Sequence, residues 1–368
     1  MFDITVLGCS GGTLEVGTSA YLVKSSRVPY QEILERELTD EIVAVDCGSG
    51  LAKLCEIVYD ELCGEGDSMA IKSLSFYTKD QVSCLEKFTS RGIKRVGMQL
   101  DTQSESTPMQ VAWKLNHMVK NYLLTHPHLD HCSGLVINSP SFGAHSGKRV
   151  HGLDSTCKAL GENVFNNVIW PDLTASDKGS CLQLCSMEDH VPKAINSTYT
   201  VTPFKVKHGE LTSSESYAST SFVISHRVLK RSILMFGDLE ADDPDTPNEG
   251  LNWKIWQHVA PMIVDGSLRT VMIECSTPNV DANQPLYGHL TPATLFQELL
   301  RLRDMVRSLN GSETLEGLEV LITHIKHENA MIPDPREVIL GELTELKTLH
   351  NLEVNFTILL PGQTYTVS

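Results

Sequence analysis

The sequence contains no apolar run long enough to span a membrane and no signal-peptide pattern at its amino end. It also lacks internal repeats, low-complexity tracts and linkers. Hydrophobic residues make up 41% of the 368 positions and charged residues 21%, which is ordinary for a soluble globular protein. We therefore expect a soluble, cytoplasmic chain that is long enough to bury a substantial core.

The ten cysteines include no C-x-x-C pair, and most of them are widely dispersed. In a chain of this size without a secretory signal, this pattern predicts free thiols in a reducing compartment. Cys132 and Cys275 lie close to residues that we single out below as functional. We expect both to be packed small residues and not metal ligands, because oxygen and nitrogen donors are already numerous there.

A basic patch is also missing, and the formal net charge is −16. Arg301, Arg303 and Arg307 have the spacing of a solvated helix face. An acidic surface repels phosphate backbones, so a large nucleic-acid substrate is disfavoured. We expect no nucleic-acid partner and no membrane partner.

The segment His126–His131 (HPHLDH) holds three imidazoles and one carboxylate within six residues. Neutral imidazole nitrogens and carboxylate oxygens are the usual ligands of zinc and related divalent metals. A single ion cannot easily use all four side chains of one tight loop and keep an open position. Two adjacent ions can, with His126 and His128 on the first and Asp130 and His131 on the second. The alternative is a polar loop whose histidines are solvated or bonded to the backbone.

Polar residues that can bind metals recur at the ends of later strand-like runs. The runs are 201–206 near His208, 232–236 before Asp238, 270–273 before Glu274 and 320–323 before His324. Repetition of this pattern predicts one site at the rim of a β architecture. His324 is favoured over His327 because it follows its strand immediately, but the two exchange if that strand ends later. Asp46 lies at the end of an earlier strand. It either fixes a loop by accepting backbone hydrogen bonds or lies just outside the metal ligands and supports one of them.

Alternating strands and helices favour a single α/β domain over residues 1–368, with an insertion at about 64–108 that carries no recognisable motif. Thr291-Pro292 predicts a helix start, and Asp334 predicts another with Glu337 placed for a capping box. Residues 352–358 alternate and predict a half-buried strand. The aromatic and amide-rich segment 163–172 is either a core corner or a pocket wall that stacks on a base.

The order of these residues resembles the metallo-β-lactamase superfamily. The resemblance rests on this ordered set: His126-x-His128-x-Asp130-His131, His208, Asp238, His324, and also Gly11-Gly12 and Val45–Gly48. It covers nearly the whole chain. It implies an αββα four-layer sandwich, in which helices flank two central sheets and metals lie at one edge.

Within that superfamily the chain looks most like the class II, fungal-type cyclic-nucleotide phosphodiesterases. The similar motifs are residues 126–140, 168–173 (VIWPDL), 273–276 (IECS) and 287–290 (YGHL). This likeness implies hydrolysis of 3′,5′-cyclic AMP to the 5′-monophosphate, with cyclic GMP as an alternative substrate. It also implies a homodimer.

The resemblance assigns roles to the individual residues. One ion would be bound by His126, His128 and His208, and the other by Asp130, His131 and His324. Asp238 would bridge both ions. Two divalent ions about 3.5–4 Å apart can share a hydroxide that attacks phosphorus. Zinc is expected, with manganese or iron as alternatives.

The leaving ribose 3′ oxygen needs a proton, for which His289 is the candidate donor or, alternatively, a phosphate clamp. Glu274 would orient His289, and Asp130 is counted as catalytic as well as a ligand. The plainer interpretation of Glu274 and His289 is a structural pair at a strand end.

Three relatives in the superfamily are rivals for this function. A tRNA 3′-processing nuclease would need a basic arm, and a glyoxalase II-type thioester hydrolase would not be expected to carry the 287–290 element. A true β-lactamase is disfavoured because Asp130, His131 and Asp238 complete a second metal position. A catalytically silent binding module is the least favoured, because the ligand set is complete.

Overall fold

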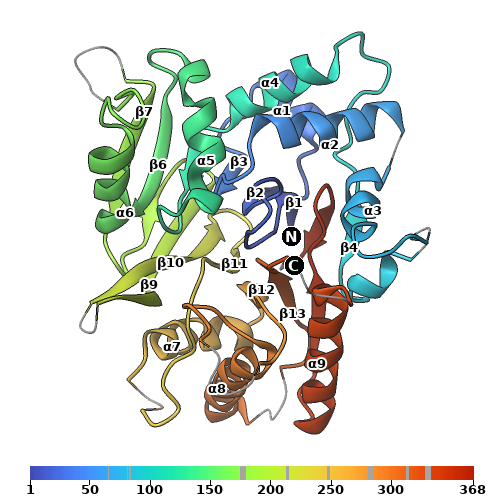
Figure 1. Cartoon of the computed structure of the whole chain (residues 1–368), viewed down its shortest axis with the longest axis vertical. Helices are drawn as coiled ribbons and strands as arrows, with labels where there is room; N and C mark the ends of the chain where they lie inside the picture. Colours follow the sequence, from blue (N-terminus) through green and yellow to red (C-terminus); the bar gives the residue numbers. More distant parts are fainter. Residues whose placement is uncertain are drawn as a thin grey trace.

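The computed structural model of the chain describes residues 1–64, 66–80, 82, 84–174, 180–212, 215–246, 249–280, 285–311, 315–327 and 333–368. Two β-sheets pack face to face, and helices cover the outer face of each sheet (Figure 1). Three apolar clusters fill the spaces between these layers. No described helix is long and apolar enough to cross a bilayer.

The first sheet has eight strands and contains both antiparallel and parallel pairs. In spatial order they are β4 (Lys94–Val96), β15 (Thr364–Val367), β1 (Phe2–Gly8), β2 (Ala20–Ser25), β3 (Ile42–Val45), β5 (Asn121–Leu123), β6 (Lys148–Leu153) and β7 (Leu182–Met187). Val43 and Val45 face the other sheet, whereas Ile42 and Ala44 face the helices. Both faces of β3 are therefore buried, which explains its continuous apolar sequence.

The second sheet has seven strands, and the four that come last in the sequence run parallel to one another. In spatial order they are β14 (Val354–Ile358), β13 (Leu318–Thr323), β12 (Leu268–Glu274), β11 (Arg231–Phe236), β10 (Glu215–His226), β9 (Tyr199–Thr212) and β8 (Lys193–Ala194). The carboxyl ends of β11, β12 and β13 therefore lie at one edge of this sheet.

Two sets of helices bury the outer faces of the sheets. The first sheet is covered mainly by α1 (Tyr30–Arg36), α2 (Leu51–Cys63), α4 (Pro108–Met118) and α5 (Leu129–Asn138), with α6 (Asp154–Ala159) beside β6. The second is covered by α3 (Ser68–Leu74), α7 (Leu251–Val264), α8 (Pro292–Asn310) and α9 (Pro335–Leu349). Thr291 caps α8 with Pro292 at the first turn, so that predicted helix start is confirmed.

Four local predictions change in the structure. β9 runs to Thr212, so His208 lies inside the strand and not after it, because pairing with β10 continues past two register shifts. β14 is almost entirely buried and not half-buried, because α9 covers one face and the segment at and after η1 (Glu86–Phe88) contacts the other, where Ser90 N donates to Thr357 Oγ1. Glu337 forms an ion pair with Lys87 instead of a capping box. The predicted insertion supplies α3 to one core and β4 to the first sheet.

Candidate metal centre

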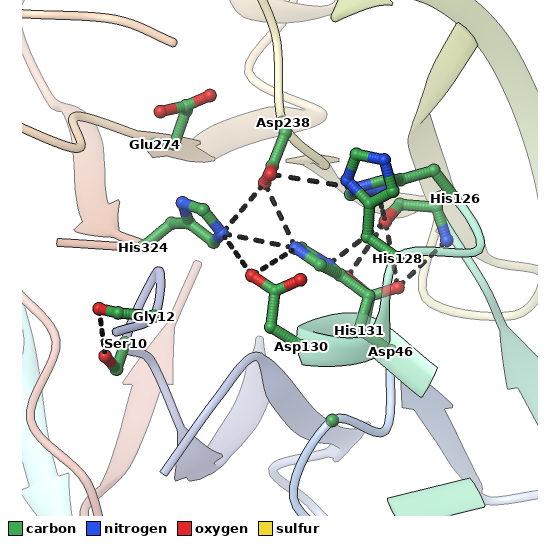
Figure 2. Close-up of polar contacts among 12 residues, drawn as sticks. Ser10, Gly12, Asp46, His126, His128, Asp130, His131, Asp238, Glu274 and His324 are labelled. Atoms are coloured by element: carbon green, nitrogen blue, oxygen red, sulfur yellow. Dashed lines mark hydrogen bonds and ion pairs between the residues drawn. The ribbon is translucent and has the colours of Figure 1, made fainter. Parts of the chain in front are cut away.

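The predicted ligands come from strand ends of both sheets. β5 ends at Leu123; His126 and His128 precede α5, and Asp130 and His131 lie in its first turn. On the opposite sheet, Asp238 follows β11 and His324 follows β13. Because parallel strands bring their carboxyl ends to one edge, these side chains converge on one space (Figure 2).

Three imidazoles form the first group of potential ligands. One ring nitrogen of each of His126, His128 and His208 lies within 4.8 Å of the others. His128 Nδ1 and His208 Nε2 are only 3.3 Å apart. Two lone pairs at that distance repel each other, so this arrangement suits a cation or proton held between the rings.

Asp130, His131, Asp238 and His324 form the second group, again with all ligand atoms within 4.8 Å. Asp238 Oδ1 lies 3.3 Å from His131 Nε2 and 3.2 Å from His324 Nε2. Its other oxygen, Oδ2, lies 3.7 Å from His126 Nε2 on the side of the first group. One carboxylate therefore reaches both groups, as a bridging ligand must.

The remaining ring nitrogen of four histidines is hydrogen-bonded on the outer side of the centre. The partners are Thr125 Oγ1 for His126 (3.1 Å), Asp46 Oδ2 for His131 (2.8 Å), Gly288 O for His208 (2.8 Å) and Ser276 Oγ for His324 (3.0 Å). Each of these contacts uses Nδ1, which leaves Nε2 to face the centre. Such outer contacts fix the tautomer and orientation of metal-binding imidazoles.

The surroundings shift the pKa values of two of the proposed ligand histidines in opposite directions. His126 is 1% exposed, and its Nε2 has no hydrogen-bond partner among the described residues. Burial, together with nearby His131, holds the pKa of His126 well below its usual value, so the lone pair is free. Burial disfavours charge on His131 too, but the carboxylates of Asp238 and Asp46 raise its pKa well above the usual value. This donor set of imidazole nitrogens and carboxylate oxygens suits divalent metal ions.

A second functional pair adjoins the centre. Glu274, the last residue of β12, is 1% exposed, and its Oε1 lies 3.0 Å from His289 Nδ1. Burial opposes charge on both groups. The Glu274 carboxylate nevertheless raises the pKa of His289, and His289 lowers the pKa of Glu274. The two side chains therefore form a buried ion pair.

A family model for class-II cAMP phosphodiesterases matches residues 37–362 of this chain. The chain belongs to this family. A 3′,5′-cyclic-nucleotide phosphodiesterase of Saccharomyces cerevisiae is 33% identical to this class-II phosphodiesterase, over 99% of each chain. The 3′,5′-cyclic-nucleotide phosphodiesterase of Schizosaccharomyces pombe is 31% identical, over 99% of this chain and 92% of the relative.

Solved structures confirm the fold of the phosphodiesterase. Unliganded yeast PDE1 superposes with a TM-score of 0.85 at 32% identity, covering 100% of this chain and 99% of the other. The metallo-β-lactamase fold protein YhfI of Bacillus subtilis superposes with a TM-score of 0.52 at 15% identity, covering 99% and 98%. The predicted metallo-β-lactamase architecture and the predicted family are both confirmed.

Ser276 is a site residue of the phosphodiesterase for which the sequence suggested no role. It is fully buried, and its hydroxyl contacts Glu274 Oε2 as well as His324 Nδ1. With His324 Nε2 facing the centre, His324 Nδ1–H donates to Ser276, and Ser276 donates to Glu274. Ser276 therefore connects the metal group to the Glu274–His289 pair. A small polar residue two positions after a charged strand end was the available signal.

Other candidates lie outside the centre of the phosphodiesterase. His327 lies beside Tyr77, with 2.6 Å between Nδ1 and the phenol oxygen, while the neighbouring His324 faces Asp238. Burial raises the pKa of Cys132 to about 12, so it is a protonated core thiol. In the segment 163–172, Phe165 is buried in the core, whereas Val168 and Ile169 are 84% and 66% exposed.

Proposed function

We propose that this class-II phosphodiesterase hydrolyses 3′,5′-cyclic AMP to 5′-AMP, with 3′,5′-cyclic GMP as an alternative substrate. Family membership and the names of the curated relatives support this substrate class. The observation that carries the proposal is the convergence of seven nitrogen and oxygen donors at one edge of the sandwich. Such a set can bind and activate a phosphodiester, whereas one isolated histidine cannot.

Two divalent ions, with zinc expected, complete the proposed site. The proposed ligands are His126, His128 and His208 for one ion, Asp130, His131 and His324 for the other, and Asp238 between them. When bound, the ions would supply a bridging hydroxide at neutral pH and offset the charge of the phosphate.

Opening the cyclic phosphate breaks the bond between phosphorus and the ribose 3′ oxygen, and that oxygen must then gain a proton. We assign this proton to Nε2 of His289, because Glu274 holds the opposite nitrogen and favours the protonated ring. Asp130 stays ionised, since His324 and His131 lower its pKa to about 2 against the effect of burial. The ionised carboxylate of Asp130 can therefore bind a cation and also position the nucleophile.

The test is hydrolysis of cyclic AMP and cyclic GMP by the purified protein, with products separated by chromatography. We expect 5′-AMP from cyclic AMP, loss of activity on chelation and recovery when zinc is returned. A metal-loaded protein that leaves cyclic AMP unchanged would refute the substrate assignment. Precursor tRNA and a glutathione thioester would then be assayed.

Sedimentation tests the expected homodimer, which should have twice the 40.7 kDa mass of the chain.

A further inference from the structure

A cavity of about 340 Å³ lies beside the metal centre but separate from it. Residues from the 9–17 loop and the 323–327 segment line it on one side, and α2, α3 and Phe76 line it on the other. None of the seven proposed metal ligands is among its described lining residues. Because a Cβ on Gly11 would lie 2.5 Å from His324 Nδ1, this loop packs on His324 and stands between the two spaces.

The rim of the cavity is apolar and partly exposed. Phe76 and Val16 both line it and are 63% and 55% exposed. Leu14 and Met69 add further apolar surface, and a flexible thioether adapts well to a flat ligand. Phe76 and Met69 belong to the 64–108 segment, so this segment builds one wall of the cavity.

The strong charges around the cavity are already paired. Arg336 forms an ion pair with Asp334 at 2.7 Å, and Lys53 pairs with Glu56 at 2.6 Å. The other charged lining side chains, Lys72 and Glu15, are exposed and opposite in sign. A phosphate or carboxylate would find no buried unpaired cation among the described lining residues, so a charged ligand is disfavoured.

Among the described lining residues, His327 presents a directional polar group to the cavity. Burial lowers the pKa of His327 to about 4, so the ring is neutral, and burial raises the pKa of the Tyr77 phenol. Tyr77 therefore donates to His327 Nδ1 at 2.6 Å, which leaves the ring proton on Nε2. No described residue accepts a hydrogen bond from that Nε2–H.

We propose that this cavity binds an uncharged, flat aromatic heterocycle of the size of a nucleobase or nucleoside. Phe76 and Val16 would cover its faces at the rim, and His327 Nε2–H would donate to a ring acceptor. The cavity volume lies at the small end of the usual range for ligand sites. Met69 and Phe76 of the 64–108 segment, for which the sequence suggested no function, would complete this site.

The proposed site also borders the loop that packs against His324, one of the proposed metal ligands. Gly11 N donates to Ile325 O at 3.1 Å, and His327 N donates to Gly12 O at 3.2 Å. Figure 2 shows Ser10 and Gly12 on the His324 side of the centre, away from His128. A ligand in the cavity therefore presses on the loop that packs against His324.

Titration calorimetry with adenosine as the probe tests the proposal on the full-length protein without any catalysis. We expect one adenosine per chain, bound equally in the absence and presence of saturating 5′-AMP, which fills the metal site. Phe76→Ala should weaken binding about tenfold, because an aromatic contact is lost. Val16→Trp should block the rim, whereas Val228→Ala, a substitution of an exposed valine elsewhere, should change nothing.

Three results would overturn the proposal. The first is no adenosine binding up to about 10 mM, which is weaker than ordinary specific binding. The second is displacement of adenosine by 5′-AMP, which would place it at the metal centre. The third is binding that neither Phe76→Ala nor Val16→Trp alters. Each leaves the proposed hydrolysis of cyclic AMP untouched, since that reaction is measured separately.

Discussion

At the scale of single residues, the Glu274–His289 pair distinguishes an acid catalyst from a further metal ligand. We expect His289→Gln to lower kcat for cyclic AMP by about 10²–10⁴-fold while metal content stays unchanged. The physical reason is that the departing 3′ oxygen would lose its proton donor. Kinetics and elemental analysis of the same sample measure both quantities.

A substrate that needs no acid is the control for this variant. p-Nitrophenolate leaves without protonation, so a p-nitrophenyl phosphodiester should be cleaved almost equally by His289→Gln and the unmodified protein. Loss of metal together with loss of both activities would show that His289 is a ligand, because its ring also lies within ligand distance of His208 and Asp238.

A second prediction at this scale concerns His151 on β6, which is 2% exposed and bonds Asn121 Oδ1 through Nε2. Burial lowers its pKa to about 4 from an unfolded value of about 6.5. Between those values the unfolded chain binds the proton and the folded chain does not. The free energy of unfolding should therefore fall by up to about 3 kcal/mol as the pH drops from about 6.5 to about 4.

Urea unfolding in the presence of a chelator, at several pH values, measures this effect. His151→Gln cannot titrate, so its unfolding free energy should lose that part of the pH dependence. Equal slopes for the two proteins would contradict the assignment. The chelator keeps both proteins free of metal, so that pH-dependent release of metal does not add to the measured effect.

At the scale of elements, the loop after β1 supports His324. Because Gly11 in this loop has no side chain, the loop can pack directly against His324. In Gly11→Ala the new Cβ would lie 2.5 Å from both His324 Nδ1 and His324 O. We expect His324 to shift and metal affinity to fall about 10–100-fold, as when an outer contact of a ligand is lost. Gly341→Ala in α9 is the control, because no atom lies within 4 Å of its added Cβ. Unchanged zinc affinity in Gly11→Ala would contradict this role.

The sequence predicted the strands that carry the site because their apolar runs end abruptly in His, Asp or Glu. It did not predict that β9 continues through His208, since Gly209 at φ +70° and two register shifts keep the pairing with β10 intact. Nor did it predict the burial of β14, because the partner surface of a strand depends on tertiary packing. The roles of Ser276 and Gly11 depend on contacts with His324, almost 50 and more than 300 positions away, which no local pattern encodes.

At the scale of the whole molecule, the two sheets meet at one edge of the sandwich, where both halves of the chain supply metal-binding side chains. The segment 126–131 comes from the first sheet, while Asp238 and His324 come from the second. Sequence order and family resemblance predicted this layered arrangement. The cavity next to the centre was not predicted, because Phe76 and Val16 have no shared motif and meet only in the folded chain.

The central claim is that this edge of the molecule hydrolyses cyclic AMP with two bound ions. The most direct measurement is a zinc titration of the chelated protein that records 5′-AMP formation at each step. Our account predicts activity that is absent without metal and reaches its maximum at two zinc ions per chain. Asp238→Asn should abolish that maximum, because the bridging carboxylate is lost. Full activity in the metal-free protein, or a maximum at one ion, would contradict the account.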